Sequence, residues 1–268
     1  MSAEFSVPLV QVTSRDNPLL KTLRRLSQEP TGYRKVGQIW LEGDHLCRAA
    51  LLKGLQPAFA VFSASYWPLV TAEYGDVAIK NIVVADSLWA DISGLESPAQ
   101  MGFVMNMAPA ATLDPGAATV VLDRVQDAGN VGSILRSAAV FGFGQVLALK
   151  GTAALWSPKV IRAGMGAHFA LRLLEGLEPA SLSGLQIPVV VTSSHAGASL
   201  HQQQIPMPCA WVMGHEGQGV SEELMVLAKA TGLTVRIDQP GGEESLNVGA
   251  AAAICLYASA VGRARSSF

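Results

Sequence analysis

Short runs of apolar residues alternate along most of this chain with stretches in which apolar residues recur every three or four positions. A short apolar run bounded by turn residues is typical of a buried strand, and the longer spacing is typical of an amphipathic helix. From Ala118 onward the two patterns alternate regularly, which predicts a mostly parallel sheet covered by helices on both faces. The strands predicted in this part are Thr119–Leu122, Gln145–Leu149, Ala170–Leu174, Pro188–Val191, Cys209–Met213 and Leu233–Ile237.

The first hundred residues show the same alternation. Ser14–Leu26 contains a capping residue and a proline, and its leucines then recur at helical spacing, which predicts an amphipathic helix with a basic face. Residues 108–117 combine two prolines, a glycine and small residues, as linkers do. We therefore predict an α/β protein with a domain at 1–107, a linker at 108–117 and a second domain at 118–268. The strands predicted in the first domain are Val36–Glu42, Phe59–Phe62, Asn81–Val84 and Met101–Met107.

Two glycine-rich loops follow the last two predicted strands. Gly214–Gly219 comes after the strand that ends at Met213, and Pro240–Asn247 comes after the strand that ends at Ile237. Each loop leads into a predicted helix, so both loops are expected at the carboxyl ends of neighbouring parallel strands. Open α/β sheets bind their ligands at that edge, and we expect the two loops to form a cofactor pocket.

A third polar stretch follows the first strand of the second domain. Asn130 is expected to cap the helix that begins there. Arg136 lies six residues further along, among apolar neighbours, where an arginine needs a partner. Either a salt bridge to Asp123 or Asp127 satisfies the guanidinium, or the guanidinium is one of the reacting residues of the site.

Two common nucleotide sites are disfavoured. The chain lacks G-x-G-x-x-G, and the loop at 214–219 lacks the lysine of a P-loop and is followed by Glu222 and Glu223, which disfavour a phosphate at that helix start. Glu216 inside the loop is placed to accept hydrogen bonds from a ligand or from loop amides. Ser245 and Asn247 open the last helix and are suited to capping it or to orienting a hydroxyl or an amine.

Composition and charge narrow the class of protein. Half of the 268 residues are apolar and 15% are charged, as in a well-buried globular protein. The net charge is −2, yet residues 1–53 hold eight basic residues against five acidic ones, which indicates either a phosphate-rich partner or a solvated helix face. Three widely spaced cysteines, without metal-ligand spacing, suit a reducing cytoplasm. The amino terminus lacks signal-peptide features, and the Ala-rich run 245–262 is interpreted as a buried helix rather than a membrane span.

Together, the three polar stretches resemble the SpoU/TrmH-type RNA 2′-O-ribose methyltransferases of the SPOUT class. Asn130-x-Gly132-x-x-x-Arg136 matches the first motif of that family, Gly214-x-Glu216-Gly217-x-Gly219 the second, and Glu244-Ser245-Leu246-Asn247-Val248 the third. The resemblance covers almost the whole chain. It includes Ser157–Ala163, which is similar to the region between the first two motifs, and Asn17–Lys21 with Leu41–Gly43, which are similar to the family's L30e-like substrate-binding domain.

The resemblance implies an L30e-like first domain and a SPOUT second domain, whose mostly parallel sheet carries a trefoil knot that binds S-adenosyl-L-methionine. By motif match, the backbone at Gly214, Ile237 and Leu246 holds the cofactor, and Thr192 and Ser193 enclose its adenine. The family works as a homodimer whose final helices pack together. No metal and no membrane association are expected, and the cytoplasm is the expected location.

The implied reaction is methylation of a ribose 2′-hydroxyl in structured RNA, with 23S ribosomal RNA as the expected substrate. The alternatives are the same reaction on tRNA and a non-catalytic RNA-binding protein with a relict cofactor site. Because guanidinium stays protonated in proteins, we expect Arg136 to hold the adjacent phosphate and to stabilise the developing alkoxide. The match to the family's catalytic set is Asn130, Arg136, Glu216, Ser245 and Asn247. The expected RNA contacts are Arg15, Lys21, Arg24, Arg25, Arg34 and Lys35.

The chain departs from the family pattern at two places. Ile237 is followed by Asp238 and Gln239, where the family usually has a proline, and Gly164-Met165-Gly166 stands where many members have Ser-x-Gly. Both departures bear on the pocket and the substrate and leave the core motif residues intact.

Overall fold

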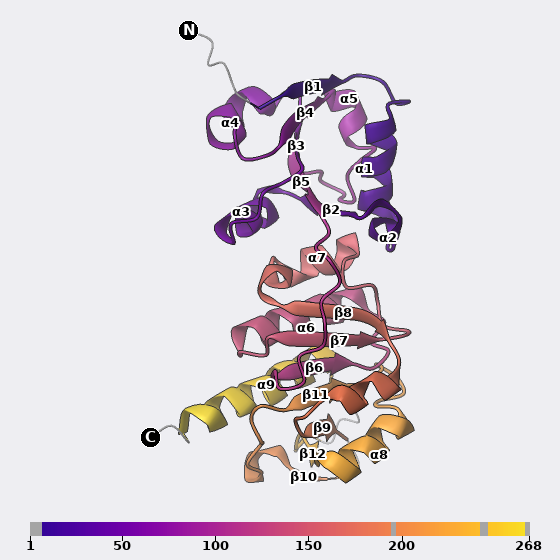
Figure 1. The fold of residues 1–268 in the computed structure, drawn as a ribbon, viewed down its shortest axis with the longest axis vertical. Helices are drawn as coiled ribbons and strands as arrows, with labels where there is room; N and C mark the ends of the chain where they lie inside the picture. The colour runs from indigo at the N-terminus through magenta and orange to yellow at the C-terminus, as the bar shows by residue number, and fades with distance from the viewer. Residues whose placement is uncertain (1–6, 194–196, 242–245, 266–268) are drawn as a thin grey trace. The chain divides into compact units, whose positions relative to one another are not determined.

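The computed structural model describes residues 7–193, 197–241 and 246–265, and it contains two compact units, each built around one sheet (Figure 1). The first unit comprises the residues up to 109 together with 156–169, and the second comprises 110–155 together with the residues from 170 on. The break after 109 falls inside the expected linker. Segment 156–169, expected in the second domain, belongs to the first unit because α7 (Pro158–Gly164) packs against β2 (Gln38–Glu42) and α1 (Pro18–Gln28).

The first unit has a mixed five-stranded sheet in the order β1-β4-β3-β5-β2. β1, β4 and β3 run parallel, whereas β5 is antiparallel to both β3 and β2. The remaining strands are β1 (Leu9–Val12), β3 (Phe59–Ser63), β4 (Lys80–Val84) and β5 (Met101–Asn106). The remaining helices are α2 (Gly32–Val36), α3 (Asp44–Leu52), α4 (Trp67–Tyr74) and α5 (Asp86–Trp89), and the 3-10 helix η1 spans Ala167–Ala170.

Most elements of this unit agree with the sequence pattern, and two differ. The helix α1 begins as predicted, with the Asn17 side chain accepting from the Leu19 N–H at 2.9 Å and proline in the first turn. The predicted strand 36–42 is shorter, because Val36 ends α2 and Gly37 takes a left-handed conformation (φ 72°) before β2 starts. The strand β1 was not predicted, since it is an edge strand with mostly exposed residues and so lacks a long apolar run.

The second unit has a seven-stranded sheet in the order β10-β12-β9-β11-β6-β7-β8, and every pair in it is parallel. The strands are β6 (Thr119–Leu122), β7 (Gln145–Leu149), β8 (Arg172–Leu177), β9 (Val189–Thr192), β10 (Ala198–Ser199), β11 (Ala210–Met213) and β12 (Leu233–Arg236). The helices are α6 (Ala128–Val140), α8 (Glu222–Thr231) and α9 (Val248–Arg265), with 3-10 helices η2 (Pro179–Gly184) and η3 (Leu200–Gln202).

The strand order corrects one expectation. β11 and β12 were expected to be neighbours, but β9 lies between them and pairs with both. The end of β9, at Thr192, therefore lies between the ends of β12 and β11. The strand predicted from Ala170 begins two residues later, because the backbone is still in η1 at Ala170.

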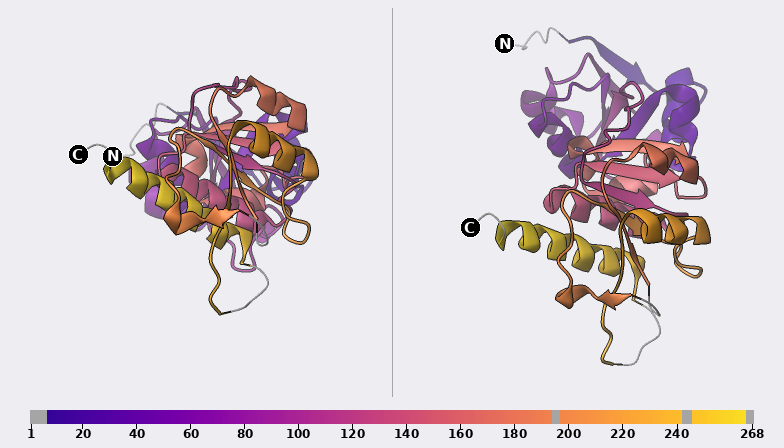
Figure 2. Two further views of the ribbon diagram at one scale, coloured as in Figure 1. Left: turned by 90° about the horizontal axis from the view of Figure 1, so that it is seen from below. Right: turned by 60° about the horizontal axis from the view of Figure 1, so that its bottom comes forward.

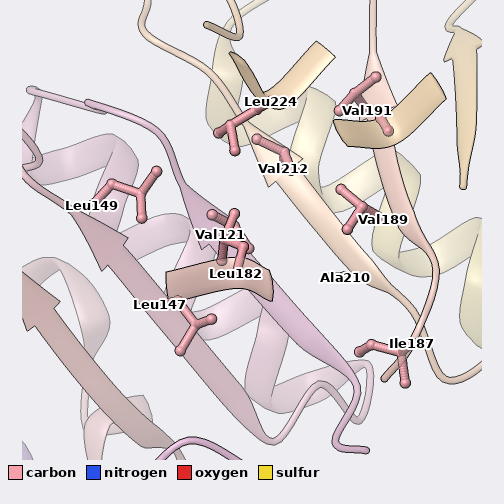
Figure 3. Close-up of a cluster of buried hydrophobic side chains, with 11 residues drawn as sticks. Val121, Leu147, Leu149, Leu182, Ile187, Val189, Val191, Ala210, Val212 and Leu224 are labelled. Carbon is pink, nitrogen blue, oxygen red and sulfur yellow. The ribbon is translucent and has the colours of Figure 1, made fainter. Parts of the chain in front are cut away.

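Helices cover both faces of this sheet. One face carries an apolar cluster in which Leu224 and Ala228 of α8 pack with strand residues such as Val121 and Val212 (Figure 3). Neighbouring residues of a strand point to opposite faces, and Trp211 accordingly donates its indole N–H to Ser259 of α9 at 2.9 Å. The helices α8 and α9 thus lie on different sides of the unit, with α9 alongside α6 (Figures 1 and 2).

Candidate active site

A pocket of about 850 Å³ opens where β9, β11 and β12 of the second unit end. Its volume lies within the range of ligand-binding cavities, roughly 300–1,000 Å³. All five residues predicted to contact a cofactor line it: Thr192, Ser193, Gly214, Ile237 and Leu246. Because β9 lies between the other two strands, its end adds Thr192 and Ser193 to the two loops.

Glu216 is the centre of a hydrogen-bond network beside this pocket. The backbone N–H of Gln126 donates to its Oε2 at 3.1 Å, and the N–H of Asp127 donates to its Oε1 at 3.0 Å. The Asn130 amide also donates to Oε1, at 3.1 Å. Burial alone would raise the pKa of Glu216, but these donors outweigh it and lower the pKa from 4.5 to about 2. The carboxylate therefore stays ionised and joins the loop after β11 to the start of α6.

Asn130 extends the network to the third motif. Its Oδ1 accepts from Nδ2 of Asn247 at 2.9 Å, and Oδ1 of Asn247 in turn accepts from the N–H groups of Gly249 and Ala250. Asn247 thus caps α9, as one of its two predicted roles requires. Asn130, however, is not the cap of α6, because Asp127 takes that position and accepts from the Asn130 N–H at 2.8 Å.

Arg136 lies on the exposed side of α6. Among the residues that the structure describes, its side chain has no hydrogen bond and no ion pair. The alternative of a salt bridge to Asp123 or Asp127 is not realised, because Asp123 pairs with Arg124 and Asp127 caps the helix. The guanidinium is therefore available to a ligand. Ser245, the remaining predicted catalytic residue, lies outside the described residues.

Asp123 and Arg124 form a second link, between the end of β6 and the segment that follows β11, and the sequence pattern did not predict it. The buried Asp123 carboxylate accepts from the Ser221 N–H at 2.6 Å and pairs with Arg124 at 2.9 Å. Arg124 has a left-handed backbone (φ 60°) and reaches across to Gln218 Oε1 at 2.8 Å. A signal was present, because an Asp-Arg pair directly after a buried strand of a parallel sheet lies at the ligand-binding edge.

The pocket also includes residues without a predicted role, next to Glu216 and Asn247, which were predicted as catalytic. The loop 214–219 taken whole would have included four of them, whereas the others flank the glycine-rich loops or lie on the helices that follow. The residues are His215, Gly217, Gln218, Gly219, Val220, Met225, Gln239, Val248 and Ala251.

The basic residues predicted to meet RNA belong to the first unit, on or next to α1 and α2. Arg15 and Arg24 both pair with Asp91, at 3.2 and 3.1 Å. Lys21 lies 3.8 Å from Asp16, and Arg25 lies 3.5 Å from Glu29. Arg34 bonds the Tyr33 hydroxyl, and Lys35 is exposed. Neighbouring carboxylates thus offset part of the positive charge.

All three cysteines are free and buried. Cys209 and Cys255 are buried thiols, and burial raises the pKa of each to about 12. Within the described ranges, no group of three or more His, Cys, Asp or Glu side chains is placed to hold a metal ion. None of the helices described is both long enough and apolar enough to cross a membrane.

Comparison with known proteins adds the family. A model described as the SpoU rRNA Methylase family matches residues 117–257. A protein of Synechocystis sp. named as an uncharacterized tRNA/rRNA methyltransferase is 31% identical, covering 93% of each chain. The 23S rRNA (guanosine(2553)-2′-O)-methyltransferase RlmP of Bacillus subtilis is 29% identical, covering 92% of this chain and 98% of that protein. The AdoMet-bound structure of an rRNA methyltransferase from Sinorhizobium meliloti has a TM-score of 0.78 at 26% identity, covering 94% of this chain and 97% of that chain.

Proposed function

The chain belongs to the SpoU rRNA Methylase family, and we propose that it methylates a ribose 2′-hydroxyl of 23S ribosomal RNA. It is an RNA 2′-O-ribose methyltransferase that uses S-adenosylmethionine. One observation carries the assignment to this site. The pocket contains every residue that the cofactor motifs single out, and it lies beside the network of Glu216, Asn130 and Asn247.

The residues of the pocket fit this cofactor. Ile237 and Leu246 offer apolar surface to a planar base, while Thr192 and Ser193 offer hydroxyl groups to its polar edge. The glycines of 214–219 let the backbone come close to a ligand. When bound, S-adenosylmethionine supplies an electrophilic methyl group on a positively charged sulfur.

The side chains of the site divide into two roles. Asn130 bonds to both Glu216 and Asn247, so we assign these three side chains to bracing the motif loops around the pocket. Glu216 is poorly suited to be the base that removes the hydroxyl proton, because a pKa of about 2 lies far below the pH at which the reaction runs.

Arg136 is assigned to the RNA. Its exposed guanidinium, without a described partner, is suited to holding the phosphate next to the reacting ribose and to stabilising negative charge on the 2′-oxygen. Ser245 keeps its expected role of orienting the hydroxyl as part of this proposal.

The finer features that the motif resemblance implies belong to the same proposal: an L30e-like first domain, a SPOUT second domain with a trefoil knot, a cytoplasmic location and a mechanism without metal. A homodimer through α9 is supported by Ile254 and Tyr257, which are 41% and 58% exposed on that helix. Sedimentation of the chain tests the dimer, and a monomer at micromolar concentration would contradict it.

The alternative substrate is tRNA, which the name of the Synechocystis relative includes. Methyl transfer from labelled S-adenosylmethionine to unmodified 23S rRNA and tRNA, assayed in parallel, separates the two. An alkali-resistant linkage at the labelled nucleotide identifies ribose methylation. Label in tRNA alone would contradict the 23S assignment.

The role of Arg136 is tested with Arg136→Ala and Arg136→Lys. Loss of one charged hydrogen-bonding group from a transition state costs about 10²–10³ in turnover, so we expect Arg136→Ala to slow methyl transfer by that order. Arg136→Lys should recover part of the rate, since lysine keeps the charge but not the bidentate geometry. Cofactor affinity, measured by calorimetry, should be unchanged in both, and its loss would show that Arg136 serves the cofactor instead.

A further inference from the structure

His215 closes the loop that lines the pocket, both with its backbone and with its ring. Its N–H donates to the Gly219 carbonyl at 3.0 Å, and its carbonyl accepts from the Gly219 N–H at 2.8 Å. Inside the turn so formed, the ring nitrogen Nδ1 accepts from the N–H of Gly217 at 2.9 Å and from the N–H of Gln218 at 3.2 Å. One side chain therefore satisfies two successive backbone donors of the loop.

These two hydrogen bonds determine which nitrogen of the His215 ring carries the proton. Both groups that face Nδ1 are N–H donors, so Nδ1 must offer a lone pair and the ring proton must lie on Nε2. A protonated imidazole has a proton on each nitrogen and cannot accept either bond. Protonation of His215 is thus incompatible with the loop as it stands, and the loop must open or the ring must leave it.

We propose that His215 is a positioning residue for the cofactor site. Its neutral ring holds loop 214–219 in the conformation that binds the cofactor, and protonation of the ring makes cofactor affinity fall at acid pH. This inference rests on the proposed function, since it assumes that this pocket holds S-adenosylmethionine. The loop residues concerned, Gly217 and Gln218, both line that pocket. A loop that opens therefore changes the wall against which the ligand packs.

The charged groups near the loop come from three elements. Arg124 at the end of β6 bonds Gln218 and is itself neutralised by the buried Asp123. Glu216 lies next to His215 in the loop, and its pKa of about 2 keeps it ionised throughout the range in which imidazole titrates, about pH 5 to 8. The others are Asp127 at the cap of α6 and Glu222 and Glu223 in the first turn of α8.

Another histidine lies near the same edge and provides a rival explanation. Nδ1 of His201 lies 2.9 Å from the Asp238 carboxylate, which also accepts from Ser199 and Arg236. Asp238 lies between the pocket residues Ile237 and Gln239. Protonation of His201 would add an ion pair here rather than break a bond, so this cluster is not expected to weaken binding in acid.

The experiment is calorimetric binding of S-adenosylmethionine to the 268-residue chain across about pH 5 to 8, the range in which imidazole changes its charge. Wild-type affinity should fall by about tenfold toward the acid end, as two hydrogen bonds of ordinary net strength are lost. His215→Ala should bind about tenfold more weakly than wild type already at the alkaline end. His215→Asn should restore that binding and keep it in acid, because an Asn side-chain oxygen accepts bonds from the backbone two residues on and does not titrate.

Matched variants separate the possible outcomes. Titration of the ligand itself is common to all the proteins and cancels in the comparison. His45→Asn removes an exposed imidazole of the first unit, and its cofactor affinity should depend on pH as that of wild type does. An acid-dependent loss that persists in His215→Asn, or that disappears in His201→Asn, would overturn the inference. Absence of binding by wild type at every pH would instead contradict the proposed function.

Discussion

At the scale of single residues, the site depends on polar groups whose hydrogen bonds are made between distant parts of the chain. Glu216 shows this best, because its carboxylate accepts from Gln126, Asp127 and Asn130, which precede it by 86 to 90 positions. An ionised acceptor with several donors is stabilised relative to its protonated form. Glu216 therefore contributes to the stability of the second unit as well as to the shape of the pocket.

The pH dependence of this contribution follows from the lowered pKa. The folded pKa is about 2 against an ordinary value of 4.5, so the stabilisation is complete above pH 4.5 and is lost as the pH falls toward 2. Because Glu216 is exposed, solvent screening limits the effect. We expect Glu216→Gln to lower the free energy of unfolding by about 1 kcal/mol above pH 4.5 and by much less near pH 2.

Urea unfolding at both ends of that range measures the difference. Glu96→Gln, which removes an exposed carboxylate of the first unit, is the matched control. A deficit for Glu216→Gln that is equally large near pH 2 would mean that the variant acts by something other than loss of the charge.

At the scale of elements, α9 is the helix that completes the site, since its amino end carries Asn247 and its body covers the sheet. The contact to β11 is specific. Trp211 and Ser259 are both buried, and the indole N–H donates to the Ser259 hydroxyl. A buried donor without an acceptor costs more than an ordinary hydrogen bond contributes.

We therefore expect Ser259→Ala to destabilise the second unit by about 1–3 kcal/mol, the cost of leaving the indole N–H unpaired. Ser137→Ala is the matched control. The Ser137 hydroxyl makes the same bond to the carbonyl four residues earlier in its helix, and this bond is exposed. Ser137→Ala should therefore change the free energy of unfolding by no more than about 0.5 kcal/mol. Equal effects of the two substitutions in chemical denaturation would contradict the assigned role of the indole contact.

At the scale of the whole molecule, charge is distributed unevenly on a chain whose net charge is −2. The proposed RNA contacts belong to the first unit and the proposed cofactor pocket to the second. Four of the basic residues have acidic neighbours, whereas Lys35 is exposed and belongs to the short helix α2. RNA phosphates must compete with those carboxylates for the paired residues.

Binding to 23S rRNA fragments should weaken as salt rises, because neutralised phosphates release counterions. We expect Lys35→Ala to reduce the slope of log affinity against log salt by about one, as the loss of a phosphate contact does. Lys229→Ala, which removes an exposed lysine of α8 in the second unit, should leave the slope unchanged. Filter binding over a salt series measures both, and a binding constant independent of salt would remove the basis for the proposed contacts.

The sequence by itself predicted most of the local elements and several of the residues that line the pocket. Apolar runs mark β6, β7 and β11 within a residue of their ends, the proline and Asn17 mark the start of α1, and the glycine-rich loops contain half of the residues that line the pocket. These features depend on the side-chain pattern and on neighbouring backbone groups, which a short stretch of sequence contains.

Only the tertiary structure decided which elements meet. It placed β9 between β11 and β12, assigned segment 156–169 to the first unit, replaced the expected cap Asn130 by Asp127, and left Arg136 without the salt bridge that was one of its two alternatives. It also gave Asn130 its partners Glu216 and Asn247, which follow it by 86 and 117 positions. Strand order and such pairings could not be predicted, because backbone hydrogen bonds between strands are alike whichever strands form them. The choice among them depends on how all the side chains pack at once.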